Sequence, residues 1–177
     1  MATHVALLHS VTLAPGKRLV MAEWRDMMAA IGLERPHTLI ATGNALFDSS
    51  GASVAQLEQR LETAFARRFG RHIDTIVTTA AQWHGLAAAN PFPEEEDGTR
   101  IAVRVMRTPL DPSALAALAP YATQGEQLKL VDGHLWLHFA QDPARSRLTA
   151  QLTIRRLGAG TVRNWNTVRR LDEMIAG

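Results

Sequence analysis

Arginine is concentrated in one stretch of the chain, between Asp142 and Asp172, where no acidic residue occurs. The planar guanidinium of arginine binds a carboxylate or a phosphate through two parallel hydrogen bonds. Ser146 and other short polar side chains of the same stretch add hydrogen-bond donors. This chemistry suits a small phosphorylated or carboxylated ligand, so we predict an anion-binding site here. The arginines are Arg145, Arg147, Arg155, Arg156, Arg163, Arg169 and Arg170.

A simpler interpretation of these arginines is that they lie in solvent on a pair of helices. Some of them fall in expected C-terminal turns, where a cation interacts favourably with the helix dipole. Guanidiniums that are brought together repel one another, so a fold that gathers them needs solvent exposure, carboxylates from elsewhere or a bound anion. The stretch itself supplies no carboxylate. The anion site and the solvated helices therefore stay as alternatives.

A second polar group follows at residues 163–167. The start of a helix needs only one capping side chain, whereas this segment offers a guanidinium and two amides close together. We predict that Arg163, Asn164 and Asn166 join residues 145–147 in a ligand-binding pocket at the junction of two halves of the chain. The alternative is a structural clasp, in which an asparagine caps the helix, Trp165 packs and Arg163 pairs with a carboxylate of the other half.

The chain lacks the residues of several common catalytic and cofactor sites. It has no cysteine, which excludes disulfides, thiol catalysis, iron–sulfur clusters and cysteine-ligated zinc. It has no Gly-x-Ser-x-Gly or His-Glu-x-x-His motif, and its glycines complete neither a dinucleotide loop nor a phosphate loop. His134 and His138 lie on one face of an expected strand but about 13 Å apart, too far to share one metal ion. We therefore predict no metal site and no cofactor, and no catalytic residue is identified.

The composition is that of an ordinary folded protein. Hydrophobic residues make up 46% of the 177 residues, charged residues make up 20%, and the formal net charge is +2. Disordered chains are far more polar and charged. The first residues lack the pattern of a secretory signal, and no apolar run approaches the roughly 20 residues of a membrane-spanning helix. We expect a cytoplasmic protein without a membrane partner.

The first half of the chain follows the order β-α-β-β-α-β. Gly43 and Asn44 tolerate positive φ, which suits a tight turn between two strands. Ser53 and Gln56 form a capping box, which predicts the start of a helix. The expected strands are residues 4–8, 38–41, 45–47 and 73–77, and the expected helices span about residues 24–31 and 53–70.

An acidic linker at residues 93–99 separates this N-terminal half, residues 1–92, from a C-terminal half at residues 100–177. Prolines and acidic residues around the linker preclude regular structure there. The pair Asp132-Gly133 is a strong signal for a β-hairpin. The second half repeats the order β-α-β-β-α, with strands at residues 101–105, 128–131 and 135–139 and helices at about residues 111–120, 146–157 and 165–175.

The shared order predicts an α+β fold of two ferredoxin-like halves, each with an antiparallel sheet covered by helices. We interpret the repetition as a duplication of topology, not of sequence. The apolar patterns predict one core with Leu7, Leu39, Phe65 and Ile76, and another with Val103, Leu115, Leu130 and Leu137.

Five segments, distributed over essentially the whole chain, match the sequence motifs of a known family. They are residues 4–8, residues 21–23, Thr42-Gly43-Asn44 with Phe47, residues 90–93, and residues 145–149 with 163–168. On these segments the sequence resembles the bacterial family catalogued as domain of unknown function 1697. Members usually continue the first strand with Arg-Gly-Ile-Asn, whereas this chain has His9-Ser10-Val11-Thr12. The resemblance implies the fold and adds Asn44 to the candidate ligand-binding residues, and it supplies no reaction.

Three functions are compatible with these observations. The first is a binding module or an unassigned enzyme for a small phosphorylated or carboxylated ligand. The second is RNA binding, because ferredoxin-like sheets and arginine clusters both occur in RNA-binding domains; the first strand, however, has no aromatic residue and the third has only Phe47. The third is a structural protein with no ligand.

Overall fold

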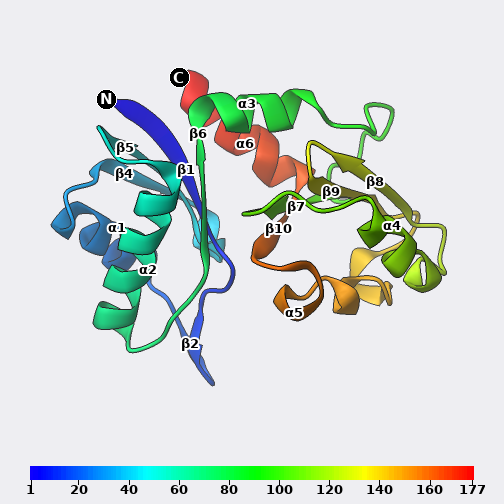
Figure 1. Ribbon diagram of the computed structural model, residues 1–177, viewed down its shortest axis with the longest axis horizontal. Coiled ribbons are helices and arrows are strands. Elements are labelled where there is room, and N and C mark those ends of the chain that lie inside the picture. Colours follow the sequence, from blue (N-terminus) through cyan, green and yellow to red (C-terminus); the bar gives the residue numbers. More distant parts are fainter. The chain divides into compact units, whose positions relative to one another are not determined.

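The computed structural model describes all 177 residues, and the chain divides into two compact units (Figure 1). Unit 1 contains residues 1–85 and 171–177, and unit 2 contains residues 86–170. The last residues of the chain thus belong with the first unit. Residues 90–100, which include the acidic linker, contain no helix or strand. None of the helices combines the length and the apolar composition that spanning a bilayer requires.

Unit 1 is built on a four-stranded antiparallel sheet with the order β4-β5-β1-β6. Gly43, with φ of +78°, ends the short turn between β4 and β5 and allows the chain to enter β5. Gly16, with φ of +73°, lies between two short strands that form a separate ribbon. The strands are β1 (Ala2–Leu8), β2 (Thr12–Ala14), β3 (Lys17–Arg18), β4 (Glu34–Leu39), β5 (Asn44–Ser49) and β6 (Thr75–Thr79).

Three helices begin in unit 1. They are α1 (Met21–Ala30), α2 (Val54–Phe69) and α3 (Ala80–Ala88). The predicted capping box of α2 is confirmed, because Ser53 Oγ accepts from the Gln56 amide and the Gln56 side chain accepts from the Ser53 amide. Gly70 ends this helix with φ of +71°.

Helices α1 and α2 cover one face of the unit 1 sheet (Figure 1). Phe65 is part of this core, as the sequence predicts. Leu7 and Ile76 are also buried, and they pair with each other across β1 and β6. Because side chains alternate along a strand, they lie on the sheet face opposite to that of Ala6 and Leu8, which belong to this core. Leu39 is only partly buried. The core members are Ala6, Leu8, Leu19, Trp24, Met27, Met28, Leu33, Ala45, Phe47, Leu57, Leu61, Phe65, Ile73 and Val77.

Unit 2 contains a second four-stranded antiparallel sheet, with the order β10-β7-β9-β8. The Asp132-Gly133 hairpin is confirmed, and both residues have positive φ, +50° and +78°. Its strands are β7 (Ile101–Met106), β8 (Gln127–Val131), β9 (His134–His138) and β10 (Gly160–Asn164); its helices are α4 (Ser113–Leu118) and α5 (Ile154–Leu157), and α6 (Trp165–Ala176) begins in it. Single helical turns lie at η1 (Ile40–Thr42) in unit 1 and at η2 (Ala119–Tyr121), η3 (Pro143–Arg145) and η4 (Thr149–Gln151) in unit 2.

The two sheets share one strand order. If the four strands of each sheet are counted along the chain, the fourth lies beside the first, followed by the third and the second. The prediction of an α+β fold with two antiparallel sheets covered by helices is confirmed. In the unit 2 core, Leu137 is buried and Leu115 packs against the cluster, whereas Val103 is buried on the opposite face of the sheet.

The predicted helix over residues 146–157 is wrong. The segment instead forms η4 and the short helix α5, with a break at Leu152 and Thr153. The guanidinium of Arg104 donates to the carbonyl oxygens of Leu152 (2.9 Å) and Gly158 (3.0 Å). Backbone carbonyls need hydrogen-bond donors, which a continuous helix would supply from its own amides. Here Arg104 supplies donors at both ends of α5 instead. Strand β10, which follows, was not predicted.

Candidate functional site

The segment from Asp142 to Leu148 in unit 2 holds three of the predicted ligand-binding residues. The Asp142 side chain accepts from the Ala144 amide (3.0 Å) and begins η3. Ser146 is buried, donates to Glu126 and accepts from the Leu148 amide (3.2 Å). Burial alone would raise the pKa of Glu126, but the hydrogen bonds from Ser146 and the Gln124 amide lower it below its usual value. Ser146 therefore holds this segment in place through hydrogen bonds to Glu126 and to the Leu148 amide.

Arg145 and Arg147 flank Ser146 and are exposed. Their guanidiniums make no hydrogen bond or ion pair within the protein. Arg147 borders a pocket of about 380 Å³ whose other walls include Tyr121 and Gln151. The Tyr121 ring carries the guanidinium of Arg156 5.0 Å from its centre. The border of this pocket thus has a cation and an aromatic ring, and Arg147 is the residue of the predicted site that lines it.

Arg163 lies on the other face of the unit 2 sheet. Its neighbour Val162 pairs with Arg104, whose guanidinium reaches the η4–α5 segment. Because side chains alternate along β10, Arg163 points away from that segment. Arg163 is buried and donates to Thr161 Oγ1 (2.7 Å) and to the carbonyl oxygen of Val162 (2.9 Å). Burial lowers its pKa to about 10. Within unit 2 the sheet therefore separates Arg163 from residues 145–147.

The asparagines beside Arg163 have structural contacts. The Asn164 side chain accepts from the Thr167 amide (2.9 Å) and caps α6. Asn166 lies against Gly98, where a Cβ atom would stand 2.3 Å from its Oδ1, and this oxygen accepts from Arg169 (3.1 Å). Trp165 donates its amide to the Gly98 carbonyl (3.2 Å), and its ring lies 6.0 Å from the Trp136 ring. The cap by Asn164 and the packing of Trp165 correspond to two parts of the predicted clasp, and the pairing of Arg163 with a carboxylate stays a prediction.

Asn44 belongs to unit 1, at the start of β5. It is fully buried, and its Nδ2 donates to the Leu39 carbonyl (3.2 Å) and to Thr42 Oγ1 (2.9 Å). The side chain closes the turn between β4 and β5. A role in ligand binding stays a prediction for Asn44.

The two histidines of β9 have separate partners. His134 Nδ1 accepts from the Met106 amide (3.1 Å), and burial lowers the pKa of His134. His138 Nε2 lies 2.8 Å from Glu95, which belongs to the acidic linker. This hydrogen bond lowers the pKa of Glu95. At least one acid of the linker therefore contacts the folded unit instead of being only solvated.

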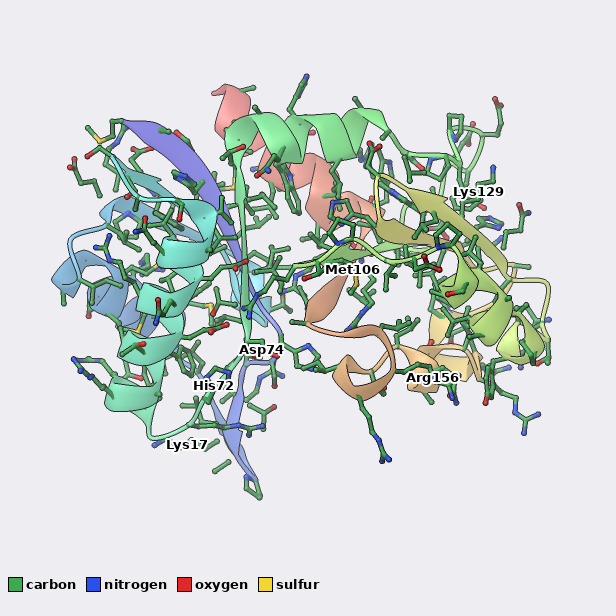
Figure 2. The ribbon with its side chains drawn as sticks, in the orientation of Figure 1. Lys17, His72, Asp74, Met106, Lys129 and Arg156 are labelled. Atoms are coloured by element: carbon green, nitrogen blue, oxygen red, sulfur yellow. The ribbon has the colours of Figure 1, made fainter.

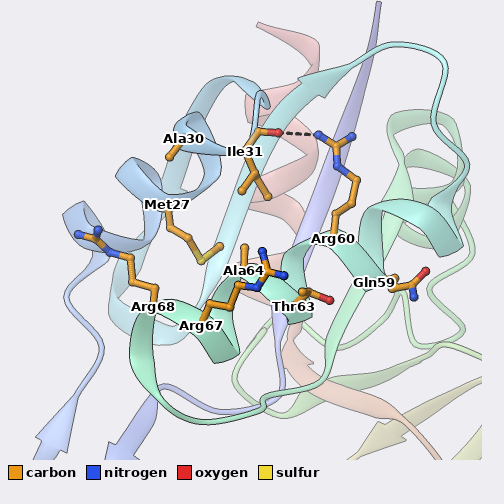
Figure 3. A pocket seen from close by; sticks show the side chains of 9 residues that line it. All are labelled: Met27, Ala30, Ile31, Gln59, Arg60, Thr63, Ala64, Arg67 and Arg68. Carbon is orange, nitrogen blue, oxygen red and sulfur yellow. Dashed lines mark hydrogen bonds between the residues drawn. The ribbon is translucent and has the colours of Figure 1, made fainter.

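A larger groove lies between α1 and α2 in unit 1, and sequence reasoning missed it (Figure 3). Its volume is about 550 Å³, and Met27, Ile31 and Ala64 supply apolar side chains to it. Three guanidiniums border it. The whole lining is Met27, Ala30, Ile31, Gln59, Arg60, Thr63, Ala64, Arg67 and Arg68.

The three arginines of the groove come from one side of α2. Arg60 donates to the Ile31 carbonyl at the end of α1 (2.6 Å), as Figure 3 shows. Arg67 and Arg68 are exposed and make no hydrogen bond or ion pair within the protein. Positions seven and eight residues after Arg60 return to the same helical face. That spacing is a signal in the sequence, but only the fold reveals the apolar partner helix.

The fold and these cavities define a two-unit α+β protein with arginine-bordered pockets. The chain belongs to the family described as "Protein of unknown function (DUF1697)", whose model matches residues 1–136. The family predicted from the sequence is thus confirmed, although residues 145–168 lie beyond the match. None of the curated proteins matches the sequence.

A solved structure has the same fold. The chain is similar to the conserved bacterial protein SP0830 from Streptococcus pneumoniae, with 23% sequence identity and a TM-score of 0.77. The similarity covers 98% of each chain. At this identity the similarity supports the fold alone.

Proposed function

We propose that the protein binds a small molecule in which an apolar body carries a carboxylate or a phosphate, and that the α1–α2 groove of unit 1 holds it. One observation carries this proposal. Arg67 and Arg68 have no partner in the protein, and they border a groove with apolar side chains. A free guanidinium beside apolar surface fits a ligand that offers both an anion and a hydrophobic group.

The groove has the size and chemistry of a small-molecule site. Its volume of about 550 Å³ is within the usual range of roughly 300–1,000 Å³ for ligand pockets. Met27 and Ile31 would contact the apolar body of the ligand. Arg67 and Arg68 would bind its anionic group, and the Thr63 hydroxyl is a further donor on the border.

A simpler explanation accounts for only part of the arrangement. Arg67 and Arg68 lie in the last turn of α2, where cations are favourable next to the helix dipole. That explains the sign of their charge. It does not explain why Arg60, a full two turns earlier, also borders the same apolar groove and is fixed to the end of α1.

The Arg147 pocket of unit 2 is a second candidate for the same class of ligand. Arg147 of the predicted site borders it, and the guanidinium of Arg156 lies 5.0 Å from the centre of its Tyr121 ring. It is smaller, and it offers one guanidinium instead of three. RNA binding is less well supported, because Phe47, the aromatic residue of the third strand, is buried and stacked on His4.

Thermal-shift and calorimetric titrations distinguish these possibilities. The probes are medium-chain alkyl carboxylates, aryl carboxylates, alkyl phosphates, inorganic phosphate and a short RNA oligonucleotide. We expect the amphiphilic anions to raise the melting temperature and inorganic phosphate to have little effect. The double variant Arg67→Gln/Arg68→Gln should weaken binding about 10- to 100-fold, because it removes charge-assisted hydrogen bonds.

Arg147→Gln is the matched control for this experiment, since it removes an equally exposed and unpaired guanidinium from the other pocket. Equal binding by this variant and the wild type supports the α1–α2 groove. Loss of binding in Arg147→Gln with retention in the double variant would move the site to unit 2. Binding of none of the anionic probes would overturn the proposal.

A further inference from the structure

Three potential metal ligands meet in unit 1, at a place distinct from the α1–α2 groove. Glu62 lies on α2, and His72 and Asp74 lie between α2 and β6. One ligand atom from each of the three side chains lies within 4.8 Å of the others. Figure 2 labels His72 and Asp74, which come from the same short connection. We propose that Glu62, His72 and Asp74 bind a divalent transition-metal ion, with Zn²⁺ as the best match.

Backbone hydrogen bonds hold two of these ligands in place. The Thr75 amide donates to Glu62 Oε1 (3.0 Å), which fixes the carboxylate against the start of β6. The Asp74 carbonyl accepts from the His9 amide (2.9 Å), which fixes the backbone of Asp74. Metal ligands in proteins are commonly oriented by such outer hydrogen bonds.

The third ligand is free to adjust. The His72 side chain is 61% exposed, and its Nε2 lies 2.9 Å from Asp74 Oδ1. Zinc binds nitrogen and oxygen ligands at about 2.0–2.2 Å, so the ligand atoms around it lie about 3.4 Å apart. Rotation of the exposed imidazole can bring the three atoms to that spacing. His72 Nε2 and the Asp74 carboxylate would then both bind the ion, and their direct contact with each other would be lost.

The choice of ion follows from the ligand types. One imidazole and two carboxylates suit Zn²⁺, Mn²⁺ or Fe²⁺, whereas Ca²⁺ and Mg²⁺ prefer all-oxygen sites. Affinities of mixed nitrogen and oxygen sites for divalent metals rise towards the end of the first transition row. Three protein ligands also leave a coordination position for water.

The arginine next to His72 is engaged elsewhere. Arg71 precedes His72 in the sequence, but its guanidinium donates to the carbonyl oxygens of Thr12 (2.8 Å) and Leu13 (3.5 Å). It forms no ion pair with Asp74. The neighbouring guanidinium therefore does not occupy the Asp74 carboxylate.

Unit 1 also contains a comparison pair. His84 Nδ1 lies 3.2 Å from Asp172, and the His84 side chain is 76% exposed, but no third ligand completes that pair. If His72 and Asp74 formed only a surface ion pair, the two histidines should behave alike towards metals. If the three residues form a site, only His72 matters.

Calorimetric titration of chelator-treated protein with Zn²⁺ tests this, together with Co²⁺ titration followed by visible absorption. We expect one ion per chain and a Co²⁺ spectrum of a low-coordinate site. His72→Gln should lower the affinity at least about tenfold, and Asp74→Asn should do the same. His84→Gln should bind like the wild type.

Because the His72 side chain is exposed, the melting temperature of metal-free His72→Gln should equal that of the metal-free wild type. Undiminished binding by His72→Gln would overturn the proposal. An equal loss of metal affinity in His72→Gln and His84→Gln would also overturn it. So would a wild type that does not bind one ion more tightly than His72→Gln does. The readout is independent of the α1–α2 groove, so this inference and the proposed function can fail separately.

Discussion

Arginine side chains serve opposite purposes in this chain. Arg104 is 1% exposed and donates to two backbone carbonyls, and burial lowers its pKa. Arg163 is also buried and bonded to neighbouring oxygens. Arg67, Arg68 and Arg147, in contrast, lie exposed beside pockets. A guanidinium with its donors occupied by carbonyls stabilises the fold, whereas one without partners is available to a ligand.

A single glycine tests how tightly the unit 1 sheet is built. Gly43 has φ of +78°, and a Cβ atom there would stand 2.7 Å from Leu8 Cβ and 3.1 Å from Val11 Cγ1. Gly43→Val should therefore lower the free energy of unfolding by about 1–3 kcal/mol from backbone strain, with a further cost from overpacking. Urea unfolding of the purified variant measures this loss.

Gly51→Val separates the two causes. Gly51 has nearly the same φ, +74°, but nothing lies within 4 Å of the place a Cβ would take. It should cost less than Gly43→Val, since only the strain remains. Equal losses would show that the contact with Leu8 relaxes freely, and an unchanged Gly43→Val would contradict the strained turn itself.

Local signals in the sequence identified this turn and several other details. The capping box of Ser53 and Gln56 and the Asp132-Gly133 hairpin depend on residues that are neighbours along the chain. Such features follow from the chemistry of a few side chains. The contacts of an arginine side chain do not follow from its neighbours in the sequence, because they depend on which face of which sheet the residue occupies.

At the scale of elements, the segment after β9 shows what sequence patterns miss. Its apolar residues Leu148 and Leu152 flank η4, and Leu157 ends α5, and all three join the unit 2 core. Their spacing resembles one helix, but Arg104 bonds the carbonyls of Leu152 and Gly158. Tertiary hydrogen bonds override helix propensity here.

Strand β10 is the other omission at this scale. Its first residue is Gly160, where a Cβ atom would stand 2.8 Å from the Val105 carbonyl oxygen. The glycine permits close pairing with β7, although glycine in a sequence normally weakens the case for a strand. Without β10 the alternation that turns Arg163 away from residues 145–147 was not foreseeable. The α1–α2 groove could not be predicted either, since α1 and α2 both line it and the sequence does not show that they pack together.

The helix that follows β10 gives a test of the clasp. Asn164→Ala removes the acceptor of the Thr167 amide, and we expect the free energy of unfolding to fall by about 0.5–2 kcal/mol. Asn164→Ser or Asn164→Asp should restore most of the stability, because either side chain can cap a helix. Thermal or urea unfolding reports both effects.

Binding titrations of Asn164→Asp complete this comparison. If Asn164 only caps α6, the variant should bind the anionic probes like the wild type. A variant that keeps its stability but loses binding would return Asn164 to the ligand site predicted from the sequence.

At the scale of the whole molecule, one of the two units is formed from two separate segments of the chain. Residues 171–177 belong to unit 1, although unit 2 precedes them in the sequence. Leu171, the first residue of this returning segment, is fully buried. The sequence indicated two halves, but a linear pattern cannot show that one half is completed by the end of the other.

Leu171→Ala measures how much this return contributes. Removal of a buried leucine side chain should lower the free energy of unfolding by about 2–5 kcal/mol. Asp172→Asn is the control, since it weakens only the exposed contact with His84 and should cost less than about 1 kcal/mol. A Leu171→Ala loss no larger than that of the control would mean that residues 171–177 add little to unit 1.

The discontinuity also orders events during protein synthesis. Residues 1–85 leave the ribosome before unit 2, but the segment that completes their unit is translated only after unit 2. The nascent chain must therefore keep an unfinished first unit while the second is being made. Unit 2 is continuous, so it is the part that can reach its final form before translation ends.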